Sequence, residues 1–307
     1  MTVDWTVWKP RLAYGAFFVV AFLVALRQTL PAEAIKDRLV LEAGQRGWLL
    51  DAADAGPAGL VGLGLKEVTL KDRDGLTVPI DALDVSLAPW SLLRGRLRLA
   101  VRARLYDGTV KGTFDLNGAP QLLDVAVDKV DLGRVIPLRR ASGVDLDGVA
   151  SGSASLTLPA DPKVQPSGRA ELVVTGAGLA GGKVAVPGMT GGLTLPKLSL
   201  GQLGVNVALE GGKATFVKLG TSGGDATLVA DGLTLGLPPG GKLEYAPIFG
   251  QLSVKLSDAF AARPEGKTLK SLADLALAPG KGSDGAYHVQ LFGSVGHPQA
   301  RAAPPRP

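Results

Sequence analysis

The sequence predicts a mainly β protein that carries one N-terminal transmembrane helix ahead of an antiparallel β-sheet ectodomain. Three observations support this prediction. The chain has one long apolar run, residues 12–26, and nothing like it follows. Behind that run, apolar residues recur at every second position, which is the period of a strand with one buried and one wet face. Glycine is abundant, at 42 of 307 residues, and suits the tight turns that such a chain needs.

The apolar run predicts a membrane anchor. The run covers about 23 Å of a ~30 Å hydrocarbon layer, and extending it to Leu30 makes a single span. A cleaved signal peptide, with Ala32-Glu33-Ala34 as an A-x-A-like site, and a buried core helix stay open as alternatives. The predicted regions are a cytoplasmic tail (1–11), the transmembrane anchor (12–30), a β-rich periplasmic domain (31–299) and a disordered tail (300–307).

Two short helices and a series of strands are predicted after the anchor. Residues 31–46 are predicted to form an amphipathic helix, because Ile35, Leu39 and Ala43 recur every four residues. A second short helix is predicted over residues 269–277. Apolar residues alternate with polar ones in seven segments, each predicted to be a strand: 83–87, 97–105, 110–116, 154–158, 205–209, 233–237 and 287–291.

Glycine pairs predict the turns between these strands. Asp-Gly and Asn-Gly are strong signals for two-residue hairpin turns. They occur at Asp74-Gly75, Asp107-Gly108, Asn117-Gly118, Asp147-Gly148 and Asp231-Gly232. Residues 159–166 and 184–196 are irregular and are predicted to be loops or a subdomain joint. No stretch alternates strands with long helices, so a βαβ architecture is not expected.

Composition excludes several functional classes. The chain has no cysteine, which rules out disulfides, thiol catalysis and cysteine-ligated metals. The net charge of +5 is mild and does not point to nucleic acid. His288 and His297 are too few and too isolated to predict a zinc site. We therefore expect no cofactor, no metal ion and no nucleic-acid partner.

Five motif fragments carry no chemistry in their sequence context. The G-x-G-x-x-G at 176–181 lacks the following helix that a dinucleotide site needs, so it predicts a glycine turn. The G-x-S-x-G at 220–224 also lacks a following helix and predicts a β-turn. Residues 263–268 end like a P-loop but lack its first glycine. Residues 72–75 and 145–148 lack the further ligands of a calcium loop and predict hairpin turns. No catalytic residue is predicted.

Arginines alternate along one strand, opposite an apolar face. The basic residues are Arg94, Arg96, Arg98, Arg102 and Arg104. They are candidate contacts for anionic lipid head groups or for an acidic partner. The alternative interpretation is a solvated or edge strand protected by like charges. Changing the arginines at 96, 98, 102 and 104 to glutamine is expected to leave folding nearly intact. The apolar residues expected on the inner face are Leu97, Leu99, Val101 and Leu105.

Short segments spread over most of the chain match one known pattern, which starts with a short anchor and a Pro-Ala-x-x-Ile-Lys helix and includes a glycine, strand, glycine element at 105–112. These segments are 31–36, 64–70, 82–85, 92–95, 105–112, 131–132, 146–148 and 291–298. Together they resemble the type II secretion system protein N family, which belongs with the AsmA-like periplasmic proteins. Asp107 stands where a second glycine is common in that pattern. None of these motifs is catalytic.

The resemblance implies a non-enzymatic component of the type II protein secretion system, anchored in the bacterial inner membrane with the bulk of the chain in the periplasm. Its partners would be the membrane and other secretion components. It also implies an elongated, bent sheet with an apolar concave face. The alternative function is a lipid-binding or lipid-transfer groove protein with phospholipid as its ligand. A lipid carrier needs an apolar surface open to solvent, whereas a scaffold closes that surface with a second layer of its own.

Overall fold

The computed structural model describes residues 32–45, 47–59, 62–72, 75–88, 91, 95–136, 144–161, 164–184, 193–237 and 245–304. Within these ranges, no helix is both long enough and apolar enough to cross a bilayer. The predicted tail at 1–11 and the whole of the predicted anchor at 12–30 lie outside the described residues, as do residues 305–307. The anchor therefore stays a prediction.

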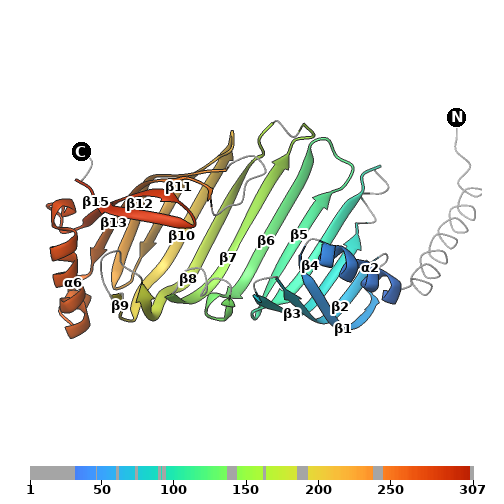
Figure 1. The fold of residues 1–307 in the computed structure, drawn as a ribbon, viewed down its shortest axis with the longest axis horizontal. Coiled ribbons are helices and arrows are strands. Elements are labelled where there is room, and N and C mark those ends of the chain that lie inside the picture. The colour runs from blue at the N-terminus through green and yellow to red at the C-terminus, as the bar shows by residue number, and fades with distance from the viewer. Residues whose placement is uncertain are drawn as a thin grey trace, which may run out of the picture. The chain divides into compact units, whose positions relative to one another are not determined.

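Strands dominate the described elements (Figure 1). The strands are β1 (Leu49–Pro57), β2 (Gly62–Lys71), β3 (Thr77–Leu87), β4 (Arg98–Leu105), β5 (Gly108–Asp115), β6 (Gln121–Asp131), β7 (Val144–Leu158), β8 (Ser167–Val184), β9 (Leu193–Leu195), β10 (Leu198–Glu210), β11 (Lys213–Ser222), β12 (Ala226–Gly236), β13 (Ile248–Leu256), β14 (Tyr287–Ser294) and β15 (His297–Ala302). The described helices are α2 (Ala32–Gln45), α5 (Asp258–Ala261) and α6 (Pro264–Ala276), with 3-10 turns η1 (Leu132–Arg134) and η3 (Ala278–Gly280).

The strands neighbour one another in chain order in one antiparallel sheet, with β9 paired to β8 beside this path. The predicted mainly β, antiparallel class is therefore confirmed. The chain divides into two compact units, which we describe separately. Unit 1 comprises Met1–Leu105 and Thr113–Asn117, and unit 2 comprises Tyr106–Gly112 and Gly118–Pro307.

Unit 1 combines strands β1 to β4 with helix α2. Its most deeply buried large side chains are Leu65 and Val68 on β2, each 1% exposed. The helix contacts β1, and its predicted apolar stripe of Ile35, Leu39 and Ala43 is partly buried. The helix prediction over 31–46 is thus confirmed within the described residues.

Two predicted hairpin turns of unit 2 are β-bulges instead. Asp147-Gly148 lies inside β7 and Asp231-Gly232 lies inside β12, each at a shift in strand register. Both glycines have positive φ, 129° and 58°. A β-bulge and a hairpin turn both favour glycine in a backbone conformation with positive φ, so an Asp-Gly pair in the sequence does not distinguish them. The hairpin predicted at 145–148 is wrong for this reason.

The glycine-rich stretch at 176–181 is also a strand and not a turn. It lies within β8, where Gly176 and Gly181 take positive φ and the pairing with neighbouring strands shifts. The turn predicted at 72–75 is confirmed at its described residues, whereas the turn predicted at 220–224 begins later, because residues 220–222 still belong to β11. Asp72 accepts hydrogen bonds from the backbone N–H groups of Gly75 and Leu76, and residues 223–225 connect β11 to β12.

Both ends of the C-terminal region differ from prediction. Helix α6 begins at Pro264, five residues before the predicted start at 269, because proline suits the first position of a helix. The tail predicted to be disordered from 300 contributes residues 300–302 to β15. Arg301 donates to the Gln290 side chain, which ties this strand to β14.

A polar network joins α6 to β14. The Asp274 carboxylate accepts hydrogen bonds from the Tyr287 hydroxyl, at 2.7 Å, and from Lys281 Nζ. Tyr287 is 3% exposed. The two donors lower the pKa of Asp274 below its usual value, with Lys281 the larger cause. This contact fixes the helix against one end of the unit 2 strands.

Candidate functional site

The arginine segment of unit 1 separates into exposed and paired residues. Arg96, Arg102 and Arg104 are exposed, whereas Arg98 is partly buried. Arg94 lies outside the described residues. Arg102 pairs in register with Asp84 of β3, and Arg104 pairs with Ala82. Arg98 lies on the same side of β4 as Arg102 and Arg104, as predicted, but it is partly buried and does not project into solvent as they do.

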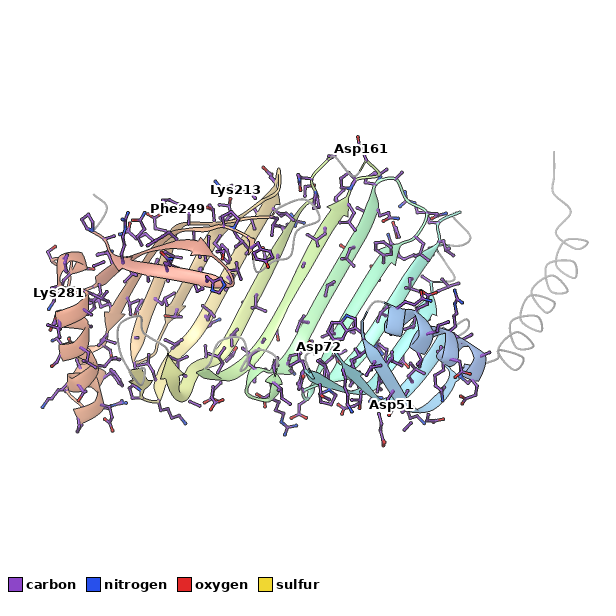
Figure 2. All side chains as sticks on the ribbon, viewed as in Figure 1. Asp51, Asp72, Asp161, Lys213, Phe249 and Lys281 are labelled. Atoms are coloured by element: carbon purple, nitrogen blue, oxygen red, sulfur yellow. The ribbon has the colours of Figure 1, made fainter. Side chains whose placement is uncertain are left out.

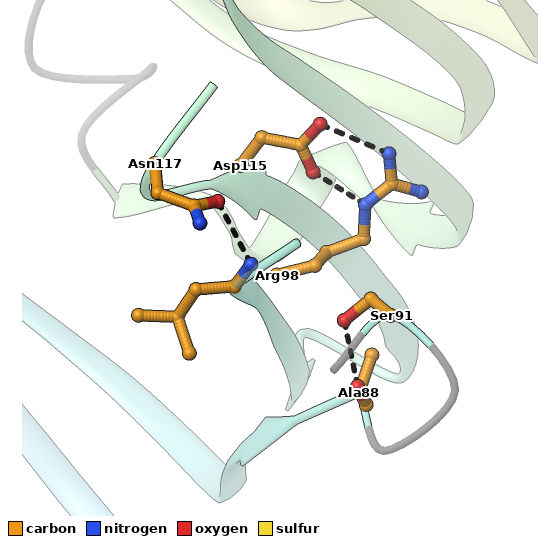
Figure 3. A network of polar contacts seen from close by, with 6 residues as sticks. Ala88, Ser91, Arg98, Asp115 and Asn117 are labelled. Carbon is orange, nitrogen blue, oxygen red and sulfur yellow. Dashed lines mark hydrogen bonds and ion pairs between the residues drawn. The ribbon is translucent and has the colours of Figure 1, made fainter. Parts of the chain in front are cut away.

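Arg98 forms a two-pronged ion pair with Asp115 of β5 (Figure 3). Its Nε and Nη2 groups each donate to one carboxylate oxygen, the second at 3.2 Å. The Asp115 side chain is only 6% exposed. Beside it, the Asn117 side chain accepts from Leu97 N–H and donates to the Gly95 carbonyl. The expectation that changing Arg98 leaves folding intact is therefore wrong, because the change would strand a buried carboxylate.

The apolar side of β4 is less enclosed than predicted. Ala103 is buried at 9% exposure, but Leu99, Val101 and Leu105 are only partly buried. Alternation placed them on the correct face. Substitution of these residues by alanine should therefore lower the free energy of unfolding by less than it would for a fully buried side chain, because part of each side chain is already exposed to water.

The Arg98–Asp115 pair should make stability depend on pH. Hydrogen bonding from Arg98 holds the pKa of Asp115 below its usual 3.8, against the opposing effect of burial. Because the folded pKa lies below the unfolded one, the stabilisation is complete above the unfolded pKa and is lost as the pH falls through the folded pKa. Asp115→Asn should lower the free energy of unfolding by roughly 1–3 kcal/mol at pH 7.

Urea unfolding of both proteins at a series of pH values checks this expectation. The difference in the free energy of unfolding between wild type and Asp115→Asn should stay constant down to about pH 5 and shrink below about pH 4. Glu171→Gln, at an exposed carboxylate of β8, is the control, and its free energy of unfolding should differ little from that of wild type at every pH. A constant gap for Asp115→Asn down to about pH 2 would contradict the assignment.

Unit 2 presents one strand face that is apolar across many strands. Residues paired directly across neighbouring strands share a face of a sheet. Following the register from β6 to β14 places the following side chains together: Leu123, Val125, Leu156, Leu172, Val205, Val207, Phe216, Leu219, Leu228, Leu252, Val254, Val289 and Leu291. We call this set the apolar face. The opposite face, or polar face, carries exposed charges such as Arg169, Glu171 and Lys255.

Every residue of this set is partly exposed, whereas Val174, Leu209 and Ala226, on the same side of the sheet, are buried. Within the described residues of unit 2, the strands belong to one sheet and no second sheet lies on it. Among the described residues, Leu132 of η1 packs against the cluster of Ala150, Val174 and Ala177, and α5–α6 cover the end of the face. There, Phe260 of α5 and Leu269 of α6 pack with Leu198, Ala226 and Leu256. Figure 2 shows Asp161 and Lys213 at the upper ends of the strands, where β7 and β10 turn into the next strand.

A cleft lies at the covered end of the apolar face. It has a volume of about 520 Å³ and lies between the ends of β7, β8 and β10 on one side and α5–α6 on the other. Apolar residues Leu179, Leu198 and Phe260 form part of its wall. The charged residues that line it are Asp147, Lys197, Asp225, Arg263 and Glu265.

Asp225 organises one side of this cleft. One carboxylate oxygen accepts from the Ser199 backbone N–H, and the other lies 3.3 Å from Arg263 Nη2. The Arg263 guanidinium stands over the Phe260 ring at 5.7 Å from its centroid. Sequence patterns do not predict this cleft, because its charged residues come from separate segments that only the fold brings together.

Sequence reasoning also missed a contact between a serine and a histidine, the residue types that form the nucleophile and base of many hydrolases. Ser253 Oγ lies 2.7 Å from His288 Nδ1, and the two residues are direct partners across β13 and β14. Neither residue lines the cleft. The register explains the contact as a cross-strand hydrogen bond. His297 pairs with Ser294 on the neighbouring strand, so the two histidines are not brought together. Among the described residues, no cluster of three or more potential metal ligands occurs.

Comparison of the chain with protein-family models, with curated proteins and with solved structures finds no match.

Proposed function

We propose that this chain is a non-enzymatic, lipid-binding protein of the bacterial cell envelope, which holds phospholipid acyl chains on the apolar face of unit 2. The observation that supports the proposal most directly is the partial exposure of the residues in that set, which spread over β6 to β14. Scattered apolar residues on a surface are ordinary, but a contiguous exposed apolar face of a sheet either binds a ligand or partner or makes the protein prone to aggregation. Acyl chains suit it because the face offers few hydrogen-bonding side chains and extends along many strands.

The alternation of the two faces supports a ligand on one side only. Val205 of β10 and Val173 of β8 lie close together but on opposite faces, since Val205 pairs with Leu172 and Val173 pairs with Gly204. A lipid that binds the apolar face should therefore contact position 205 and miss position 173.

A photo-crosslinking amino acid placed at each position in the full chain tests this. In cells grown with radiolabelled phosphate, irradiation should attach labelled phospholipid to the chain carrying the crosslinker at Val205. The chain carrying it at Val173 is the matched control and should gain little label. No label at Val205, or equal label at both positions, would overturn the lipid proposal.

The secretion function predicted from the sequence is the second candidate. It would make the chain an inner-membrane-anchored periplasmic component of the type II secretion system. The resemblance in short segments supports it, and the exposed Arg102 and Arg104 of unit 1 offer a basic surface for an acidic partner. Their charges lie on the polar side of β4, away from Ala103.

Charge removal at the exposed arginines tests this second candidate. The variant Arg102→Gln/Arg104→Gln should fold normally, because neither side chain is buried. Pull-down from cell membranes should recover fewer secretion components with this variant than with wild type, and recovery by wild type should fade with salt. The control is Lys66→Gln, which removes an exposed charge on β2. Equal recovery by the double variant and wild type would remove the arginines from the interface.

A further inference from the structure

The cleft at the covered end of the apolar face carries charges of both signs beside an apolar wall. Lys197 and Arg263 are basic, whereas Asp147 and Glu265 are acidic. Asp225 is already engaged by Ser199 N–H and Arg263. Charges of both signs around one cavity suit a ligand that itself carries both signs.

A packed row of side chains runs from the cleft wall toward the apolar face. Leu198, in the cleft wall, belongs to the cluster under α5–α6, and Leu200 packs against both this cluster and the next one. The second cluster includes Val174 and is packed by Leu172 and Leu203. Leu172 pairs with Val205 of the apolar face. The cleft and the apolar face therefore lie on one side of β8 and β10, where the partly exposed Leu172, Leu200 and Leu203 can contact the apolar chain of a molecule whose charged head is in the cleft.

We propose that this cleft binds the zwitterionic head group of a phospholipid, a phosphate diester that bears an ammonium group. This inference rests on the lipid function proposed above and assigns its head-group specificity. Lys197 and Arg263 would bind the phosphate oxygens, since both are cationic donors. Asp147 and Glu265 would bind the ammonium group. A volume of about 520 Å³ is within the range of small-molecule sites.

Asp225 has a positioning role in this arrangement. Its carboxylate holds Arg263 beside the ring of Phe260, so that the guanidinium is fixed before a ligand arrives. Its backbone carbonyl also accepts from Ser257 N–H, which connects the cleft to the start of α5. Substitution of Asp225 would disturb the fold locally, so the test uses the more exposed Lys197 and Glu265.

The experiment uses the full chain with the photo-crosslinker at Val205, reconstituted in vesicles of phosphatidylethanolamine and phosphatidylglycerol in equal amounts. Mass spectrometry of the adduct identifies the attached lipid. Wild type should be enriched in phosphatidylethanolamine, because phosphatidylglycerol has no ammonium group for the acidic residues. Glu265→Gln should reduce that enrichment by about fivefold to tenfold, the effect of one charged contact in a partly exposed site. Lys197→Gln should reduce the adducts of both lipids.

Matched controls on the polar face are Glu171→Gln and Lys255→Gln, which remove the same kinds of charge and should leave both readouts unchanged. Adducts that match the vesicle composition in wild type and in every variant would overturn the head-group assignment while leaving acyl-chain binding in place. The absence of any adduct in wild type would instead overturn the lipid function itself.

Discussion

Phe260→Ala should lower the free energy of unfolding by about 3–5 kcal/mol, the cost of emptying a well-packed aromatic site. Phe260 is 1% exposed and is the largest fully buried side chain among the described residues. It joins α5 to the sheet through Leu198 and Ala226. Its loss should therefore release the α5–α6 cover from the end of the apolar face.

Urea denaturation of the full chain, followed by circular dichroism, measures this effect. Leu275→Ala on α6 is the matched control, because that side chain is 82% exposed. It should change the free energy of unfolding by no more than about 0.5 kcal/mol. A loss below about 1 kcal/mol for Phe260→Ala would show that the helices do not depend on this contact.

Gly152→Ala should destabilise the centre of the unit 2 sheet by roughly 1–3 kcal/mol, although it adds a single methyl group. A Cβ at Gly152 on β7 would collide with the Glu171 carbonyl oxygen and come within 3.0 Å of Leu172 Cα. Both neighbours belong to the backbone of β8, so they cannot move aside without breaking the strand pairing.

Gly204→Ala on β10 is the control for this change, since nothing lies within 4 Å of the position that its Cβ would take. That variant should be neutral or gain about 0.5–1 kcal/mol, because alanine restricts the unfolded chain. Thermal unfolding of both variants separates the two outcomes. Equal midpoint temperatures of unfolding for Gly152→Ala and Gly204→Ala would contradict the close approach of β7 and β8.

The strands were predictable because their alternation reflects two environments, one on each side of the sheet. Val205 and Val207 were placed on the same face from spacing alone. Whether that face is covered was not predictable, because an open and a closed face need the same alternation. Asp147-Gly148 shows a second limit, since a bulge and a turn use the same glycine conformation.

The Arg98–Asp115 pair was predictable in principle. Positive φ at Tyr106 and Asp107 makes these two residues the centre of the hairpin, whereas the Asp-Gly signal placed the turn one residue later. With the turn placed correctly, Leu97 and Leu116 become neighbours, as their backbone hydrogen bond shows, and Arg98 meets Asp115. The cleft could not be predicted, because it needs contacts between segments far apart in the sequence.

From β6 to β8 and from β10 to β15, each strand of unit 2 pairs with the strands before and after it along the chain. Adding or deleting a pair of strands in such a chain changes the pairing of at most the two strands that flank it, and every other strand keeps its partners. The number of such pairs then sets how wide a surface the unit offers, much as repeat number sets the reach of a solenoid. In the course of evolution, a unit built this way can be resized to longer or shorter ligands by duplication or deletion of a hairpin.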